Sequence, residues 1–314
     1  MRPMTYRIPK PLIPVMGKPL IVHVIDSLPK EVDEIIVPIG YKMKMMEEYL
    51  HAHRPSHKVT LVEEQEPLGT GGAVKNVEGH IDGQFLVING DSISSLDFAR
   101  FLDFHRRKKG VASISLWPVE DPTPYGVVDL DEEQRIRRFQ EKPKKEEAFS
   151  NLINAGAYAL EYEVLDQIGK GFVSMEREVF PKLLDKGMYG MRFDGYWIDC
   201  GRREDLLRAF WTLMGPDMGE KAEKSVSDGA RLVRPFAIKE MAVVTGATVG
   251  PRAYVSERAV VGLRSHVENS VLMEDARVGA GCTILDSVID AGVSLPDGSR
   301  VESRIVSNAK DAGQ

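Results

Sequence analysis

The stretch Lys58–Val77, KVTLVEEQEPLGTGGAVKNV, decides the fold. Its first six residues are mostly β-branched or apolar and predict a strand over Lys58–Glu63. A glycine-rich turn follows, and Thr70–Val77 then predicts a helix. A strand, a glycine turn and a helix in succession form the basic unit of an α/β sheet. The stretch therefore predicts that further units of this kind surround it.

The same alternation continues on both sides of this stretch. Short apolar runs predict buried strands, and longer segments of helical period predict helices. The expected strands are Glu34–Gly40, Phe85–Asn89 and Val111–Leu116, and the expected helices are Lys42–His51 and Leu96–Lys109. Buried β-rich runs that alternate with helices indicate an α/β fold with a Rossmann-like, mostly parallel sheet. Such sheets bind ligands beyond the carboxyl ends of their strands.

From Tyr125 the pattern changes. A hairpin is expected over residues 125–139, followed by a strand at Asn154–Leu160 and a helix at Met175–Lys186. A strand pair over Tyr189–Ile198 and a helix at Glu204–Leu213 complete this region. We expect this second half to form the wall opposite the ligand end of the sheet.

A repeat begins near residue 241. One aliphatic residue recurs every six positions, with two steps of five. The repeating residues are Val243, Val249, Val255, Val261, Val267, Met273, Val278, Ile284, Ile289, Leu295 and Val301. This period predicts a small left-handed parallel β-helix of about three coils built from hexapeptide repeats. The chain is therefore expected to divide into residues 1–215, a linker over 216–240, and the β-helix over 241–308.

Composition and charge exclude several classes of protein. The chain has 314 residues, 43% of them hydrophobic, and a net charge of −6, which argues against nucleic acid as a partner. No apolar run approaches a membrane span and no signal peptide opens the chain, so a cytoplasmic protein is expected. The β-helix is expected to act in packing or self-association, which predicts a homo-oligomer.

Two features could carry chemistry. The turn Gly69, Thr70, Gly71 and Gly72 would let backbone amides approach a ligand at a helix N-terminus, although any strand-to-helix turn can be rich in glycine. Asp91 and Asp199 each follow an apolar strand, where a carboxylate can hold a hard cation that also bridges phosphates. Asp91 could equally cap the next segment, and spacing alone does not bring the two carboxylates together.

Seven short motifs stand in a fixed order along the chain. They are KPLIP from Lys10, PLGTGGA from Pro67, NGD from Asn89, YGVV from Tyr125, EKP from Glu141, NAG from Asn154 and WIDCG from Trp197. In this order they resemble the sugar-phosphate nucleotidyltransferases, and the resemblance extends from Arg2 to about Val306. The segment Glu176–Pro181, EREVFP, resembles the mannose-1-phosphate guanylyltransferase branch of that family.

The resemblance implies a reaction and a set of site residues. The reaction would transfer a nucleotidyl group from a nucleoside triphosphate to a sugar 1-phosphate and release pyrophosphate, with GTP and mannose 1-phosphate favoured. Glucose 1-phosphate with UTP or dTTP is the alternative, and so is a non-catalytic regulatory member that binds a nucleotide sugar. The implied assignments are Mg²⁺ at Asp91 and Asp199, phosphate stabilisation by Lys10, sugar-phosphate anchoring by Lys142, sugar contacts from Gly126, Glu141, Asn154 and Glu176, and nucleotide contacts from Gly69, Thr70, Gly71 and Gly72.

The opening stretch Met1–Leu20, MRPMTYRIPKPLIPVMGKPL, differs from the family pattern at its start. In the family, a first strand and a glycine-rich loop come directly before these residues. We therefore expect that Met1 is a misassigned start and that the working chain is longer. The 314-residue form is predicted to be inactive or very weakly active.

Overall fold

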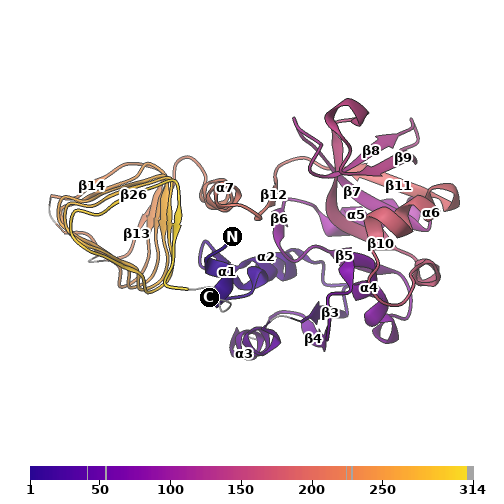
Figure 1. Ribbon diagram of the computed structural model, residues 1–314, viewed down its shortest axis with the longest axis horizontal. Coiled ribbons are helices and arrows are strands. Elements are labelled where there is room, and N and C mark those ends of the chain that lie inside the picture. Colours follow the sequence, from indigo (N-terminus) through magenta and orange to yellow (C-terminus); the bar gives the residue numbers. More distant parts are fainter. Residues whose placement is uncertain (41, 54, 224, 228, 310–314) are drawn as a thin grey trace. The chain divides into compact units, whose positions relative to one another are not determined.

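The computed structural model describes residues 1–40, 42–53, 55–223, 225–227 and 229–309 (Figure 1). The chain forms two compact units. One is continuous, Ile21–Trp197, and the other combines Met1–Leu20 with the residues from Ile198 onward. The sequence predicted domains at 1–215, 216–240 and 241–308, and these limits stay a prediction. The compact units reflect packing in space, which need not follow the limits of a family domain.

The continuous unit contains the α/β part of the chain. Its helices are α2 (Leu20–Ser27), α3 (Met43–His53), α4 (Gly69–Asn76), α5 (Phe98–Lys108) and α6 (Phe180–Leu183), with the short turns η2 (Glu78–His80), η3 (Lys145–Glu147), η4 (Tyr162–Gln167), η5 (Met175–Val179) and η6 (Leu184–Lys186). Its strands are β3 (Glu34–Ile39), β4 (Lys58–Glu63), β5 (Phe85–Ile88), β6 (Ser92–Ser94), β7 (Ala112–Pro118), β8 (Gly126–Leu130), β9 (Ile136–Glu141), β10 (Leu152–Leu160) and β11 (Met188–Arg192). Strand β12 (Trp197–Asp199) spans the boundary with the other unit.

The main sheet of this unit is mixed. Its strand order is β11-β7-β10-β8-β9, and β5 also pairs with β10. The β7–β11 pair is parallel, as is the separate β3–β4 pair, whereas β10 runs antiparallel to β5, β7 and β8. The α/β class is confirmed. The sheet is less parallel than expected because the hairpin β8–β9 joins it through the antiparallel strand β10.

Both faces of the main sheet are covered. Helix α5 begins at an N-cap, Asp97, which accepts a 3.0 Å hydrogen bond from the amide of Arg100. Its buried aromatic face, including Phe101 and Phe104, packs with Ala157 and Ala159 of β10. The alternate residues of β10 are Tyr158 and Leu160, and they pack on the opposite face with η5 and α6. The core of the unit therefore has two layers, one on each side of β10.

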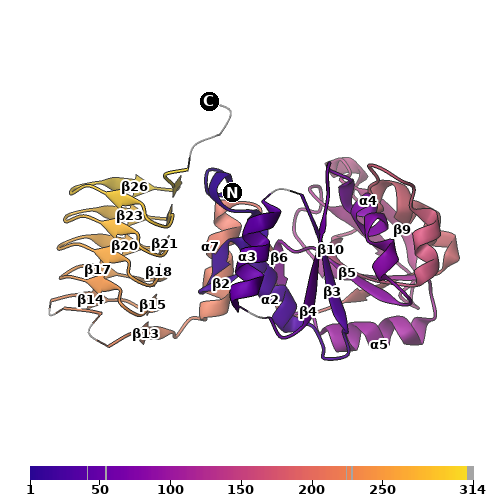
Figure 2. The ribbon, with the colours of Figure 1, turned by 90° about the horizontal axis from the view of Figure 1, so that it is seen from below.

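The second unit contains a stack of parallel strands that forms a β-helix (Figures 1 and 2). Its strands are β13 (Gly219–Lys221), β14 (Arg231–Leu232), β15 (Phe236–Ile238), β16 (Val243–Val244), β17 (Thr248–Val249), β18 (Ala253–Val255), β19 (Val260–Val261), β20 (His266–Glu268), β21 (Ser270–Leu272), β22 (Arg277–Val278), β23 (Thr283–Leu285), β24 (Val288–Ile289), β25 (Ser294–Leu295), β26 (Arg300–Glu302) and β27 (Ile305–Val306). These strands form three sheets of 6, 5 and 4 strands, so the described chain makes more than the expected three coils.

Aliphatic residues stack in three columns inside this β-helix. The columns are Leu232, Val249, Val267, Ile284 and Val301; Ile238, Val255, Leu272, Ile289 and Val306; and Val244, Val261, Val278 and Leu295. The sequence predicted Val243 as a buried position of the repeat, and this prediction is wrong by one residue. The side chain of Val243 is 45% exposed, and Val244 is buried in the column instead. Segment 216–240, expected as a linker, contributes strands β13, β14 and β15 to the first coils.

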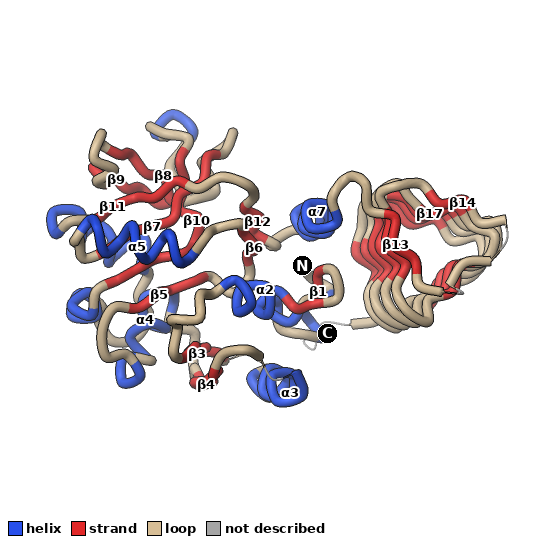
Figure 3. The backbone as a smooth tube through the Cα atoms, turned by 180° about the vertical axis from the view of Figure 1, so that it is seen from behind, coloured by secondary structure: helices blue, strands red, loops and turns tan. Residues whose placement is uncertain are grey.

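The N-terminal residues belong to the same compact unit as this β-helix. They form α1 (Met4–Arg7), η1 (Lys10–Leu12), β1 (Pro14–Val15) and β2 (Lys18–Pro19), and helix α7 (Arg203–Met214) lies beside them (Figure 3). Met4, Ile13 and Val15 are fully buried. Phe210 of α7 is 1% exposed and packs against Tyr254 of the β-helix, with 4.9 Å between ring centroids. Hydrophobic burial therefore fixes the opening segment and α7 in this unit.

Among the helices that the structure describes, none is both long enough and apolar enough to cross a membrane.

Candidate active site

Lys10 and Asp199 lie together in the second unit. The Nζ atom of Lys10 is 3.3 Å from Oδ1 of Asp199, and the two side chains are 26% and 42% exposed. Lys10 begins η1, where Pro9 fixes the backbone before it, and Asp199 ends β12. The partly exposed ammonium of Lys10 is accessible to an anionic ligand. These two residues, 189 positions apart in the sequence, thus form one ion pair.

The glycine-rich turn lies in the other unit, at the start of α4. The amides of Gly71 and Gly72 donate to the carbonyl oxygen of Val173, at 2.8 and 3.2 Å. A Cβ atom on Gly72 would lie 2.2 Å from the carbonyl oxygen of Gly171. These two glycines are therefore required for close packing of the turn on the segment before η5. Their amides are used within the protein, so nucleotide contacts from this turn remain a prediction.

Glu176 of η5 is the centre of a polar network in this unit. Its Oε2 atom accepts hydrogen bonds from the hydroxyls of Thr70 and Ser174, both at 2.8 Å. Its Oε1 atom accepts a 3.3 Å bond from the hydroxyl of Tyr158. Thr70 also accepts a 2.9 Å bond from the amide of Met175, which ties the turn to η5 a second time. The network links the predicted nucleotide turn to the predicted sugar contacts.

Asn154 lies at a β-bulge of β10. The register against β7 shifts between Asn154 and Tyr158, and Gly156 in the bulge has a φ of +80°. The side chain of Asn154 accepts a 2.9 Å bond from the amide of Gly156 and donates a 2.9 Å bond to the hydroxyl of Tyr158. The bulge therefore holds the amide group in one orientation beside Tyr158.

Glu141 ends strand β9, and Lys142 follows it. Glu141 is opposite Gly126 in the β8–β9 ladder, and a Cβ atom on Gly126 would lie 2.9 Å from Oε2 of Glu141. Lys142 has a φ of +48°, and its side chain is 58% exposed with Nζ 3.7 Å from Oε1 of Glu141. The chain turns here so that a buried carboxylate and an exposed ammonium lie next to each other.

Burial raises the pKa of Glu141, and the negative charge of Glu176 raises it further. The Glu141 side chain is only 16% exposed, so loss of hydration disfavours its charged form. Burial also raises the pKa of the Tyr158 hydroxyl well above its ordinary value. Tyr158 therefore stays protonated and acts as a neutral hydrogen-bond donor. A pair of carboxylates with neutral donors around them suits a ligand that carries many hydroxyl groups.

The sequence motifs named Thr70, Glu141, Asn154 and Glu176, whose roles stay a prediction. They did not name Tyr158 and Ser174, which hydrogen-bond to Asn154 and Glu176. Tyr158 lies in a strand whose apolar pattern indicated core packing, and only the bulge at Gly156 reveals the contact between its hydroxyl and Asn154. Ser174 is the N-cap of η5 and accepts a bond from the amide of Arg177. A Ser placed directly before the helix at Met175 was the available signal.

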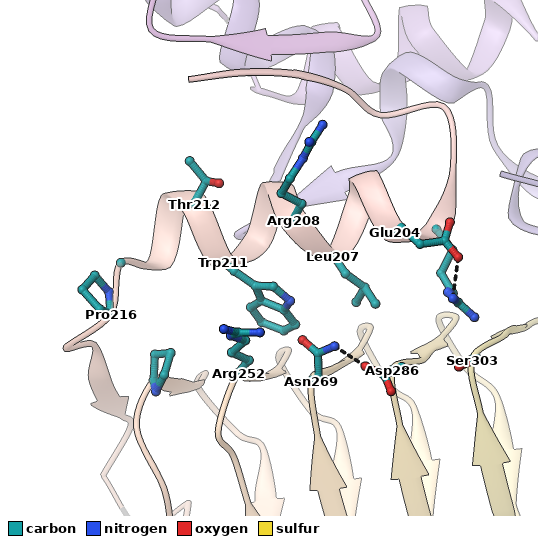
Figure 4. Close-up of a pocket in the computed structure, with 13 residues that line it drawn as sticks. Glu204, Leu207, Arg208, Trp211, Thr212, Pro216, Arg252, Asn269, Asp286 and Ser303 are labelled. Carbon is teal, nitrogen blue, oxygen red and sulfur yellow. Dashed lines mark hydrogen bonds and ion pairs between the residues drawn. The ribbon is translucent and has the colours of Figure 1, made fainter. Parts of the chain in front are cut away.

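A groove also lies in the second unit, between α7 and one corner of the β-helix (Figure 4). Its volume is about 650 Å³. One wall consists of corner residues from successive coils with left-handed backbone, which are Arg252, Asn269, Asp286 and Ser303. The other wall includes Trp211, whose ring lies beside Arg252 in the figure. None of the site residues expected from the sequence lines this groove.

The fold defines the chain as an α/β protein with a mixed sheet and an attached β-helix. The nucleotidyl transferase family profile matches residues 1–214, and a GlmU-like C-terminal hexapeptide profile matches residues 227–311. The chain belongs to the nucleotidyl transferase family. This confirms the predicted enzyme, a nucleotidyltransferase that acts on a nucleoside triphosphate and a sugar 1-phosphate.

Individual relatives agree with this assignment. The mannose-1-phosphate guanylyltransferase of Mycobacterium tuberculosis is 35% identical over 297 residues, which cover 90% of this chain and 79% of that protein. The bifunctional protein GlmU of Methanococcus vannielii is 30% identical over 327 residues, which cover 97% and 74%. The crystal structure of HddC from Yersinia pseudotuberculosis complexed with GMP-PN superposes with a TM-score of 0.56 at 30% identity, covering 65% of this chain and 89% of that one.

Enzymes of this family use a divalent metal ion. The described residues contain no group of three or more His, Cys, Asp or Glu side chains that could hold one. Asp91 follows β5 and is partly exposed, and Asp199 is 42% exposed at the end of β12. Each offers hard oxygen atoms at the end of a strand, which fits Mg²⁺ held jointly with substrate phosphates.

Proposed function

We propose that this chain transfers the guanylyl group of GTP to mannose 1-phosphate, giving GDP-mannose and pyrophosphate. The observation that supports the proposal is the network around Glu176, which joins Thr70 of the proposed nucleotide turn to Tyr158, beside the proposed sugar contact Asn154. The similarity to the mannose-1-phosphate guanylyltransferase of Mycobacterium tuberculosis, which extends over 90% of the chain, supports the choice of base and sugar.

The arrangement at the sugar end supports a hydroxylated acceptor. Glu141 and Asn154 offer carboxylate and amide groups at one end of the network, and both are predicted to read sugar hydroxyls. Lys142 extends an exposed ammonium next to Glu141 and is proposed to anchor the sugar phosphate. Gly126 is proposed to contact the sugar through its backbone. Its lack of a side chain lets Phe139 and Glu141 pack closely, because a Cβ atom there would lie 2.6 Å from Phe139 and 2.9 Å from Glu141.

In the proposed reaction, an oxygen atom of the sugar phosphate attacks the α-phosphorus of the triphosphate in line. One P–O bond forms, the bond from the α-phosphorus to the bridging oxygen breaks, and pyrophosphate leaves with that electron pair. The protein supplies positioning and charge neutralisation. Lys10 is proposed to stabilise the phosphate charge, and Asp91 and Asp199 would hold Mg²⁺, which neutralises triphosphate oxygens when bound.

The test is a pyrophosphate-release assay with Mg²⁺ and every pair of GTP, UTP or dTTP with mannose 1-phosphate or glucose 1-phosphate. We expect GTP with mannose 1-phosphate to give the highest kcat/KM. A higher value for another pair would overturn the substrate assignment. If nucleotide sugar binds but no pair turns over, the regulatory alternative replaces the enzymatic one.

Other expectations remain part of this proposal. We propose that the chain is a cytoplasmic homo-oligomer and binds no nucleic acid. The parallel strands at the ends of the β-helix leave backbone groups without a next coil, and self-association would cover them. Sedimentation velocity measures the oligomeric state directly, and a monomer at micromolar concentration would contradict this expectation.

A further inference from the structure

We propose that the β-helix positions the catalytic Lys10 through an ion pair between Arg7 and Asp290. Arg7 ends α1 in the opening segment, and Asp290 follows β24 in the β-helix. The Nη2 atom of Arg7 is 2.6 Å from Oδ1 of Asp290, and Nε is 3.4 Å from Oδ2. Two donors of one guanidinium thus contact two oxygens of one carboxylate, and this fork fixes orientation as well as distance. The inference rests on the proposed role of Lys10.

Asp290 is built into the wall of the β-helix. Its side chain is 1% exposed, whereas that of Arg7 is 40% exposed. Ser307 donates a 2.6 Å hydrogen bond to Oδ2 of Asp290, and the amide of Ala291 donates a 2.8 Å bond to Oδ1. The backbone amide of Asp290 donates to Val306 in the next coil. The carboxylate is therefore held rigidly, and a buried charge of this kind needs a cation beside it.

The connection from Arg7 to Lys10 is short and stiff. Only Ile8 and Pro9 separate the two residues. Ile8 is 8% exposed and extended, and its amide donates to the carbonyl oxygen of Met4. Pro9 has φ −65°, the angle its ring enforces, and it leads directly into η1. A backbone with no free rotation between the two residues transmits the position of Arg7 to Lys10.

A positioning role follows from this geometry. Lys10 lies 3.3 Å from Asp199 and must place one ammonium group against the substrate phosphates. Displacement of a charged group by an ångström weakens its effect on a transition state severely. The buried apolar residues of the opening segment hold it in this unit. The paired hydrogen bonds of Arg7 also fix the orientation of the segment, which nonpolar contacts do not specify. The β-helix thereby serves the chemistry without supplying a catalytic residue.

The experiment measures Lys10 directly in the full chain. The acetylation rate of the Lys10 amine is followed by mass spectrometry in the wild type, Arg7→Ala, Arg7→Lys and Asp290→Asn, with exposed Lys30 as the internal reference. Hydrogen exchange over residues 4–16 is recorded in parallel. We expect Arg7→Ala and Asp290→Asn to change the Lys10 rate by at least about threefold and to lower kcat about tenfold with KM nearly unchanged. Arg7→Lys should recover part of both.

The matched control is Arg258→Ala, which removes another Arg fork from the β-helix, 2.9 Å from Asp275. It should leave the Lys10 rate and kcat unchanged. The double variant Arg7→Ala/Asp290→Asn should be no worse than Arg7→Ala alone. Unchanged Lys10 acetylation and exchange in Arg7→Ala and Asp290→Asn would overturn the proposal. The acetylation and exchange measurements test the positioning of Lys10 even if the wild type shows no turnover. Failure of the proposed function can therefore be distinguished from failure of the positioning proposal.

Discussion

Glu141 and Asp199 are both carboxylates at strand ends, yet their surroundings differ. Glu141 is 16% exposed and faces the negative charge of Glu176, whereas Asp199 is 42% exposed and faces the ammonium of Lys10. Burial and the charge of Glu176 together disfavour the charged form of Glu141. A sugar hydroxyl that donates a hydrogen bond to Glu141 would favour the ionised form of this carboxylate. Sugar binding would thereby offset part of the cost of burying the charge.

This difference predicts the behaviour of Glu141→Gln. The folded-state pKa of Glu141 is raised, so its protonated form contributes stability that is present below the ordinary carboxyl pKa. That contribution is lost as the pH rises through the raised value. Relative to the wild type, Glu141→Gln should therefore become more stable between pH 4 and pH 7, as thermal melts would show. Its KM for sugar phosphate should rise at pH 7, because the amide group presents one acceptor fewer.

The control is Glu132→Gln, which changes an exposed carboxylate in the turn between β8 and β9. Its melting temperature relative to the wild type should vary little over the same pH range. If Glu141→Gln showed the opposite trend, with relative stability falling toward pH 7, the burial argument for Glu141 would be incorrect.

Single residues were predictable from the sequence only where a motif names them. Motifs named Thr70, Glu141, Asn154 and Glu176 in this way, and their roles stay a prediction. Hydrogen bonds join Thr70, Glu176 and Asn154 through Tyr158, whereas Glu141 interacts with Glu176 only through its charge. Tyr158 was not named, because a strand pattern cannot distinguish a core aromatic from one whose hydroxyl reaches a site. The amides of Gly71 and Gly72 were expected to face a ligand, but their bonds to Val173 depend on tertiary packing that no local pattern encodes.

At the scale of elements, Thr70 joins α4 to η5, and we expect this contact to couple the proposed nucleotide and sugar sites. Replacing Thr70 with Val keeps the shape of the side chain and removes both hydroxyl bonds, the one to Glu176 and the one from Met175. We expect KM for the sugar phosphate to rise about fivefold, the equivalent of one lost hydrogen bond. Thr70→Ser should restore most of the affinity. Equal KM values in steady-state kinetics of Thr70→Val and wild type would contradict the coupling.

The same element predicts a contrast between two glycines. In Gly72→Ala the new Cβ atom would lie 2.2 Å from the carbonyl oxygen of Gly171, whereas nothing lies within 4 Å of a Cβ atom on Gly79. Gly72→Ala should lower the free energy of unfolding by roughly 3 kcal/mol, because backbone must move. Gly79→Ala should change it by about 0.5 kcal/mol or less. Urea unfolding of both variants measures the difference, and equal midpoints would refute the packing role of Gly72.

Most helices and strands could be predicted because the spacing of hydrophobic residues along the chain depends on local secondary structure. The strand Lys58–Glu63 and the helix α5 match their expected positions to within two residues. Sheet order was less accessible, since the antiparallel strand β10 pairs with β5, β7 and β8 over long sequence separations. In the β-helix the six-residue period was correct, but each coil advances by about 17 residues, as in Phe236 beside Ala253. The five-residue steps in the repeat shift the buried position from the expected Val243 to Val244.

At the scale of the whole molecule, the β-helix and the opening segment share one compact unit. Phe210 of α7 packs on Tyr254, and both are 1% exposed. Phe210→Ala should therefore lower the stability of this unit by about 3–5 kcal/mol. Hydrogen exchange should rise over residues 4–16 and across the β-helix, and less over residues 98–108 of the other unit. Uniform loosening of both units would show that they unfold as one.

The composite unit has a consequence for the order of events during synthesis. Ile21–Trp197 is continuous, so it can fold as soon as it leaves the ribosome. Met1–Leu20 emerges first, but its Arg7 can pair with Asp290 only when nearly the whole chain has been made. If translation stopped early, the continuous unit could fold, but Arg7 would lack Asp290 as its partner. Lys10 would then lack the contact proposed to position it, so full catalytic activity would require the last coil of the β-helix.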